Sequence, residues 1–382
     1  MRLLFALVLL MASVLPAADD PRFDEAYDLF LRGRFQDALQ IYQQITKDSP
    51  KFAGAWYEMG LCQKELRQFG QAANSFRQAT NLSPNLAPAW AEMGASYVAA
   101  QKWDEALTAL QQAVKLDAKN AEAFANLGYA MWQKADPDNA EKMLKKAISL
   151  DAGQIQAYVD LGNLYLKLAK TQQGLDLLRK GFELDPTSKS AVNAYTKAVQ
   201  EHGSDRDKAY MAAWQAEVSS RFQESEQALL KLVAEDPSDF RSLALLGHVY
   251  LHQNPSKPND AIMCYLDATT QESKAKGADK LPVGSMSLVI EGLGIAHLKV
   301  GEYAKADEQF RKGKSLDKEN AWFPYDLALS AAMQGKGSAA VGYLTEACKL
   351  DPEMAGEAKD DPGFDSVRAN KDFQKVLSTY GD

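Results

Sequence analysis

The sequence predicts an all-α fold of stacked antiparallel helix pairs, an alpha solenoid. Three features predict it: glycines recur at a spacing of 34 residues, a large aromatic residue stands four residues before each glycine, and small residues follow at fixed distances. Small residues are required where two helices approach closely, and proline stops a helix because it has no N–H to donate. The glycines of the four strongest units are Gly60, Gly94, Gly128 and Gly162.

Composition limits the classes of protein that this chain of 382 residues belongs to. Hydrophobic residues make up 46% and charged residues 25%, a globular balance that excludes wholesale disorder. The net charge of −8, from 43 Lys and Arg against 51 Asp and Glu, argues against a nucleic-acid partner. Cys62, Cys264 and Cys348 are too few and too scattered for a disulfide framework or a zinc knuckle, so we expect them to be buried as small apolar groups.

Residues 1–18 have the pattern of a secretory signal peptide. Arg2 supplies the positive charge, residues 3–15 are nearly all apolar, and Pro16, Ala17 and Ala18 precede the acidic Asp19. We therefore expect an exported protein, periplasmic or secreted, with no stable membrane insertion after cleavage. The alternative is an uncleaved N-terminal anchor.

The repeat pattern divides the rest of the chain. Residues 19–188 are expected to form a five-repeat array, residues 189–205 a lone helix that acts as a joint, and residues 206–354 a second array. Residues 276–286 are surplus, polar and punctuated by Gly and Pro, which predicts a surface loop within the second array. Residues 355–382 break the pattern and are expected to cap the open end.

The repeated positions resemble those of the tetratricopeptide repeat, which has an aromatic residue, Leu-Gly, Tyr, and then Ala, Phe, Ala and Pro. Leu127-Gly128 and Leu161-Gly162 carry the Leu-Gly pair, and Tyr97 and Tyr165 stand at the family's Tyr position. The chain is similar to exported bacterial members of this family. The resemblance implies a right-handed superhelix whose concave inner wall is lined by the first helix of each pair. Such a wall suits an extended peptide or a partner's helix and requires no chemistry.

In that family, inner-wall side chains come from the second, fifth, sixth, ninth and thirteenth places of each repeat. The resemblance therefore places a ladder of carboxylates and amides on the wall of the first array, which favours cationic or hydrogen-bond-donating segments. The alternative is that these residues are ordinary solvated helix faces of an acidic protein. The candidate partner-binding residues are Asp24, Glu58, Glu92, Asn126, Asp160 and Asn163.

Few residues suggest chemistry. His248 and His252 stand four apart on an expected helix, so both project from one face, but a stable metal site needs three or four ligands. We therefore expect no catalytic residue, no cofactor and no metal, with this histidine pair as a weak metal candidate. Trp132 and Trp214 lie on first helices near the inner surface, where we expect packing in the core.

The sequence thus predicts a protein-binding scaffold that captures a partner segment in an acidic concave groove, in cell-envelope assembly or secretion. One alternative is an enzyme, either a metal-dependent hydrolase that uses His248 and His252 or a glycan-acting protein. Another is a self-associating structural spacer, in which the edge of the joint at residues 189–205 docks a second copy.

Overall fold

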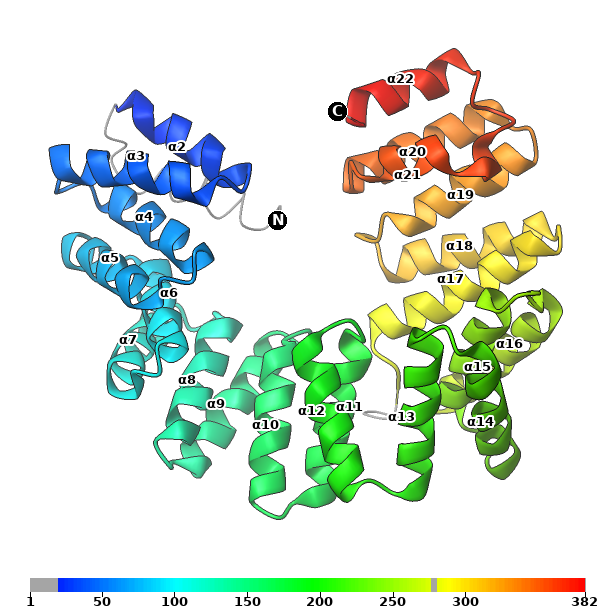
Figure 1. Ribbon diagram of the computed structural model, residues 1–382, viewed down its shortest axis with the longest axis horizontal. Helices are drawn as coiled ribbons and strands as arrows, with labels where there is room; N and C mark the ends of the chain where they lie inside the picture. The colour runs from blue at the N-terminus through cyan, green and yellow to red at the C-terminus, as the bar shows by residue number, and fades with distance from the viewer. Residues whose placement is uncertain (1–19, 276–279, 382) are drawn as a thin grey trace. The chain divides into compact units, whose positions relative to one another are not determined.

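A computed structural model describes residues 20–275 and 280–381. Throughout these residues the secondary structure is helical, with no β-strand, and consecutive helices pair with one another (Figure 1). The prediction of an all-α fold of helix pairs is therefore confirmed. The predicted signal peptide, residues 1–18, lies outside the described residues.

The chain divides into two compact units, which we call unit 1, up to Gly181, and unit 2, Phe182–Asp382. The division falls inside helix α11 (Thr171–Leu184), ahead of the predicted end of the first array at residue 188. No membrane-spanning candidate occurs in the described part of the chain, where every helix is too short or too polar to cross a bilayer.

Unit 1 is built from consecutive pairs of antiparallel helices. Each pair packs on the next, so that the first helices of neighbouring pairs, such as α6 and α8, also touch. Besides α11, its helices are α2 (Pro21–Leu31), α3 (Phe35–Asp48), α4 (Ala53–Glu65), α5 (Phe69–Leu82), α6 (Ala87–Ala99), α7 (Trp103–Leu116), α8 (Ala121–Gln133), α9 (Pro137–Leu150) and α10 (Ile155–Lys167).

The repeated glycine marks the point where the two helices of a pair come closest. A Cβ atom added to Gly60 of α4 would lie 2.6 Å from Cε1 of Phe76 on α5. Phe76 is fully buried, so its ring has nowhere to move. The same crossing recurs between Gly94 and Leu110, where the added Cβ would lie 2.4 Å from Cγ. Glycine is thus required by the packing at this position of the repeat.

One residue in each hairpin turn of unit 1 has a left-handed backbone. A residue in this conformation ends a helix sharply and lets the next helix fold back antiparallel. Only the first turn uses glycine, Gly33 with φ 73°, so the other four turns carry some strain. The non-glycine residues, each 34 positions from the last, are Arg67, Gln101, Ala135 and Ala169.

Unit 2 contains further helix pairs and one helix, α12, that precedes them within the predicted joint. The cores of its pairs include Leu229, Tyr265, Phe310 and Leu344, all nearly or fully buried. The helices are α12 (Lys189–His202), α13 (Asp205–Val218), α14 (Phe222–Glu235), α15 (Phe240–His252), α16 (Pro258–Lys274), α17 (Val283–Lys299), α18 (Tyr303–Leu316), α19 (Trp322–Met333), α20 (Gly337–Leu350), α21 (Met354–Asp360), the 3₁₀ turn η2 (Pro362–Phe364) and α22 (Lys371–Tyr380).

The loop predicted at residues 276–286 is shorter than expected. Helix α17 begins at Val283, directly after Pro282, and Ser287 near its start is 1% exposed. The last residues of the predicted loop therefore extend a first helix by one turn. Proline just before a helix favours this extension, because its restricted backbone leads into the first turn.

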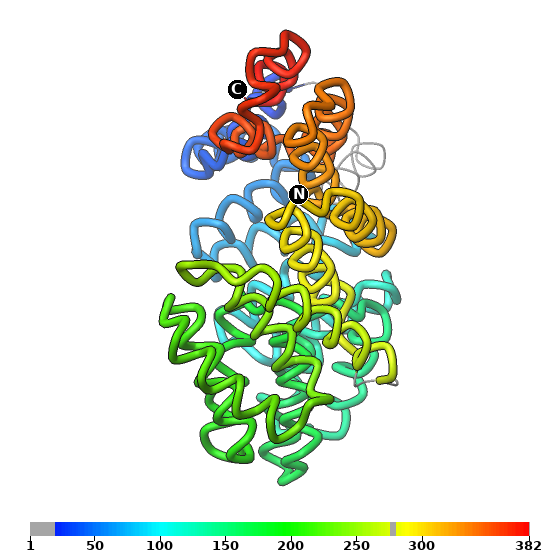
Figure 2. Tube along the Cα trace, turned by 90° about the vertical axis from the view of Figure 1, so that its right-hand side faces the viewer, coloured from blue at the N-terminus to red at the C-terminus, as the bar shows by residue number. Residues whose placement is uncertain are grey.

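The end of unit 2 is closed by the segment that follows α20. In Figure 2 the Cα trace of this segment continues past α20 as two short helices. The rings of Phe364 and Phe373 lie 5.4 Å apart and are fully buried against α19 and α20, together with Val367 and Val376. These side chains cover the apolar face that the last repeat would otherwise expose.

Candidate functional site

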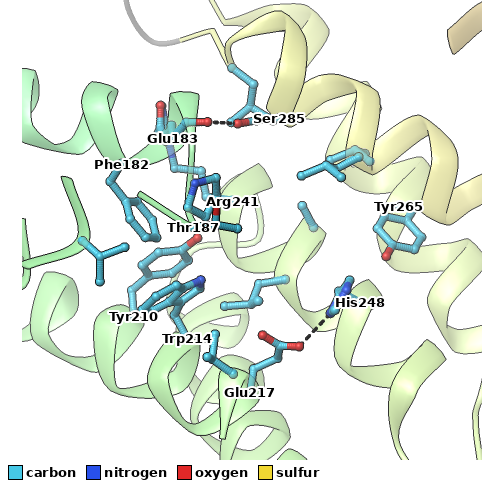
Figure 3. A pocket seen from close by; sticks show the side chains of 18 of the residues that line it. Phe182, Glu183, Thr187, Tyr210, Trp214, Glu217, Arg241, His248, Tyr265 and Ser285 are labelled. Carbon is cyan, nitrogen blue, oxygen red and sulfur yellow. Dashed lines mark hydrogen bonds and ion pairs between the residues drawn. The ribbon is translucent and has the colours of Figure 1, made fainter. Parts of the chain in front are cut away.

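A cavity of about 630 Å³ lies within unit 2 (Figure 3). Its walls come from the end of α11, from α12 and from the first helices α13, α15 and α17. Pockets of this volume with mainly apolar walls and a few polar groups are typical binding sites. Apolar and aromatic side chains form most of the lining, including Phe182, Val192, Tyr210, Trp214, Val218, Leu245, Leu281, Leu288 and Val289.

Helical spacing explains why these side chains share one space. On α13, Tyr210, Trp214 and Val218 stand four residues apart and therefore project from one face. On α15, Arg241, Leu245 and His248 form a similar stripe. The cavity is thus lined by one face of each first helix rather than by residues of a single loop.

Aromatic rings form one wall of the cavity. The rings of Phe182 and Trp214 meet edge to face with centroids 5.0 Å apart, and Phe182 also packs on Tyr195 at 5.4 Å. Burial raises the pKa of Tyr210 well above its usual value, so its hydroxyl stays protonated at neutral pH. These rings present a rigid, uncharged surface, and an exposed Val218 and Leu288 flank the opening.

The charged groups that line the cavity are mostly paired. Arg241 forms an ion pair through Nε with Oε1 of Glu183, and Ser285 donates a hydrogen bond to the Glu183 carbonyl oxygen. At the opposite end in Figure 3, Nδ1 of His248 lies 2.9 Å from Oε1 of Glu217. These pairs leave the middle of the cavity to apolar side chains.

The histidine pair does not have the surroundings of a metal centre. The rings of His248 and His252 stack with centroids 4.0 Å apart, and Nδ1 of His252 lies 2.9 Å from the backbone oxygen of His248. Burial and the neighbouring His248 lower the pKa of His252. Across residues 20–275 and 280–381, no three His, Cys, Asp or Glu side chains are grouped closely enough to hold a metal ion.

The three cysteines are free thiols. Cys62 and Cys348 are fully buried, and Cys264 is half-buried. Burial raises the pKa of Cys62 and Cys264 to about 12 and that of Cys348 to about 11. A thiolate, the form that attacks substrates and binds metals, is therefore strongly disfavoured at all three positions near neutral pH.

The predicted ladder of unit 1 is uneven in exposure. Asp24 is exposed, but Glu58 and Asp160 are only 6% and 4% exposed, and burial raises the pKa of each to about 7. Glu92 pairs with Lys64, whose Nζ lies 2.7 Å from Oε2.

The two asparagines of the ladder are more accessible than Glu58 and Asp160, as a partner-binding surface requires. Asn126 and Asn163 are half-buried, and the ladder residues lie on first helices of successive pairs, as predicted. Asp160 accepts a hydrogen bond from Nε2 of Gln156 at 2.9 Å. The predicted ladder of carboxylates and amides therefore consists of two buried acids, one ion pair and a few accessible polar groups. Its role in partner binding stays a prediction.

The helix pairs described above can be compared with known proteins. A family model for the C-terminal domain of cilia and flagella-associated protein 70, a tetratricopeptide-repeat model, matches residues 26–213. The chain has the tetratricopeptide-repeat fold. No curated protein matches the sequence significantly.

Several solved structures resemble part of this chain. MamA is 22% identical, with 42% of this chain and 94% of that chain covered at a TM-score of 0.39. YrrB, described as a TPR protein with an unusual peptide-binding site, is 22% identical, with coverage of 46% and 90% and a TM-score of 0.40. TTC0263, a TPR protein from Thermus thermophilus, is 20% identical, with coverage of 47% and 97% and a TM-score of 0.40.

The cavity was not among the sites predicted from the sequence. Trp214, expected in the core, is half-buried and lines the cavity instead. Tyr210, Arg241 and Leu245 also occupy places that the tetratricopeptide-repeat pattern assigns to the inner wall. Extending the inner-wall places from the first array to the second would have singled out these residues.

Proposed function

We propose that this chain is a protein-binding scaffold and that a segment of its partner docks an apolar side chain in the cavity of unit 2. The observation that supports this most is an apolar cavity of about 630 Å³ on the face formed by the first helices. Buried apolar anchors that fill such pockets dominate the energy of most protein interfaces. The paired charges at its ends would fix the register of the segment.

The carboxylate ladder of unit 1 contributes less to this proposal. Glu58 and Asp160 are too enclosed to meet a partner without local rearrangement, and Glu92 already has Lys64 as its counterion. We keep the first-helix face of unit 1 as a secondary docking surface, formed by the exposed carboxylate of Asp24 and the half-buried amides of Asn126 and Asn163.

The docking proposal is tested by placing a charge at the mouth of the cavity. Leu288→Glu and Val218→Glu change side chains that are 56% and 61% exposed, so both variants should fold normally. A library of 12-residue peptides is selected on the wild type, and the affinities of the selected peptides are measured by fluorescence anisotropy. We expect each variant to weaken binding at least ~10-fold, because an apolar anchor would have to displace a solvated charge.

Met263→Glu is the matched control. Met263 is an exposed apolar residue, 65% accessible, on the second helix α16, and it does not line the cavity. Its replacement should leave peptide affinity unchanged. Selected peptides that bind the Leu288→Glu and wild-type proteins equally well would place the docking site elsewhere.

We also propose that the protein is exported and acts in cell-envelope assembly or secretion, an idea that rests on the signal-peptide pattern of residues 1–18. When the full chain is expressed in a bacterium with two membranes, we expect it in the periplasmic fraction with an N-terminus near Asp19. N-terminal sequencing checks this result. Recovery from the cytoplasm with Met1 retained would contradict export.

A further inference from the structure

An acidic side chain continues the stripe of α17 that lines the cavity. Leu288 lines the cavity, and Glu291 stands three residues further along the same face of α17. Burial raises the pKa of Glu291, and the charge of His248, which also lines the cavity, offsets part of that rise, so the two groups are within electrostatic reach. Glu291 therefore lies beside the end of the cavity that His248 and Glu217 form.

Within the described residues, Glu291 has no counterion at ion-pair distance. It makes no hydrogen bond or ion pair with any residue that the structure describes, and it is only half-buried, so a ligand can reach it. Burial raises its pKa to about 7. Burial disfavours the charged form, so this carboxyl ionises near neutral pH instead of in acid.

A second acid, more deeply buried, lies on a helix that packs against α17. Asp326 of α19, a helix that contacts α17, is 4% exposed, and its Oδ2 is buried with no hydrogen-bond partner. Burial raises its pKa well above the usual value, and the charge of Glu291 raises it further. A buried polar atom without a partner costs free energy, and a bound donor or cation would remove that cost.

The nearby positive groups are engaged elsewhere. His248 is bound to Glu217, and Arg241 is paired with Glu183 at the other end of the cavity. The His248 end of the cavity therefore holds an excess of carboxyl groups.

We propose that the partner segment carries a lysine or arginine next to the apolar side chain that fills the cavity, and that this cation pairs with Glu291, with Asp326 behind it. This inference rests on the proposed docking function and adds the charge pattern of the partner. An apolar anchor followed by a cation complements the two adjoining surfaces, one uncharged and one acidic. A neutral or acidic residue at the same place would leave both acids without a counterion.

The test uses synthetic peptides from the library selection described above, each made with its basic residue next to the anchor and again with glutamine there. We expect this change to weaken binding to the wild type ~10-fold. In Glu291→Gln, which has the same shape without the charge, the two peptides should differ by less than ~3-fold. Glu308→Gln, an exposed acid on the second helix α18, is the matched control and should keep the wild-type discrimination.

Three outcomes separate the inference from the function on which it rests. If the basic peptide and its glutamine counterpart bind the wild type equally well, and Leu288→Glu still weakens the binding of both, the proposed cation is wrong but the docking site stands. The inference is also wrong if Glu291→Gln and the second variant, Asp326→Asn, both keep the wild-type difference in affinity between the basic peptide and its glutamine counterpart. If Leu288→Glu weakens no peptide, or if a neutral apolar molecule such as decanol fills the cavity and no peptide competes with it, both proposals are wrong.

Discussion

Replacement of Gly294 by alanine is expected to lower the free energy of unfolding by about 3 kcal/mol, the upper end of the range for overpacked cores. The added Cβ would lie 2.4 Å from Cε1 of Phe310, closer than carbon atoms approach in folded proteins. Phe310 is fully buried, so relief requires the two helices of the pair to move apart. Chemical denaturation followed by circular dichroism measures the change.

Gly342→Ala is the control for this prediction. Gly342 lies in helix α20 of the same unit, is exposed, and has no heavy atom within 4 Å of the position where a Cβ would stand. Alanine there should stabilise the protein by about 0.5–1 kcal/mol, because glycine loses more conformational freedom in a helix. If both variants changed stability by the same amount and sign, the close contact at Gly294 would not be the cause.

The helix pairs could be predicted because their causes are local and repeated. Each glycine opposes one large side chain sixteen residues later, as Gly60 opposes Phe76 and Gly128 opposes Leu144. The turn between them has a residue with a left-handed backbone at the same position in each pair of unit 1, although the residue type varies. Because these contacts form within a single helix pair, the residues that make them recur in the sequence at the length of one repeat.

The exposure of the ladder could not be predicted in the same way. Asp24, Glu58 and Asp160 share one place in their repeats, but only Asp24 is exposed. Exposure depends on the neighbouring pair, whose side chains differ from repeat to repeat. Burial, and to a smaller extent the charge of Glu58, raises the pKa values of Tyr42 and Tyr57, so Glu58 shares its buried surroundings with these two side chains.

Of the three features, the cavity depends least on residues that are close together in the sequence. It lies where the alternation of first and second helices is interrupted, and α12, which belongs to no predicted pair, contributes Val192 and Asn193 to the lining. Leu281 and Ser285 come from the surplus segment that was predicted to be a surface loop. The sequence indicates both irregularities, but the space that they enclose with Trp214 depends on how several helices converge.

Replacement of Glu58 by glutamine is expected to stabilise the protein at alkaline pH and to have little effect in acid. Burial raises the pKa of Glu58 to about 7 from an ordinary value of 4.5, and its Oε2 has no hydrogen-bond partner. The folded state therefore holds the proton more tightly than the unfolded state. As the pH rises from 4.5 through about 7, the wild type loses stability, because folding increasingly requires an ionised carboxyl to be buried or to take up a proton.

Glutamine has nearly the same shape and no charge to bury. At pH 8 the variant should therefore exceed the wild type by roughly 3 kcal/mol, since each unit of pKa between 4.5 and about 7 corresponds to about 1.4 kcal/mol. At pH 4.5 the two proteins should differ by less than about 0.5 kcal/mol, because the wild-type carboxyl is then protonated in the folded state. Urea denaturation at pH 4.5 and pH 8 measures both differences.

Glu92→Gln is the matched control, because Glu92 occupies the same place in the next repeat and has a counterion. Loss of its ion pair with Lys64, at 2.7 Å, should destabilise the protein at pH 8 by up to about 1 kcal/mol, the opposite sign to Glu58→Gln. Since Lys64 would then be left without Glu92, the variant cannot gain from removing a buried charge. A Glu58→Gln protein no more stable than the wild type at pH 8 would mean that Glu58 reaches solvent or a cation when it ionises.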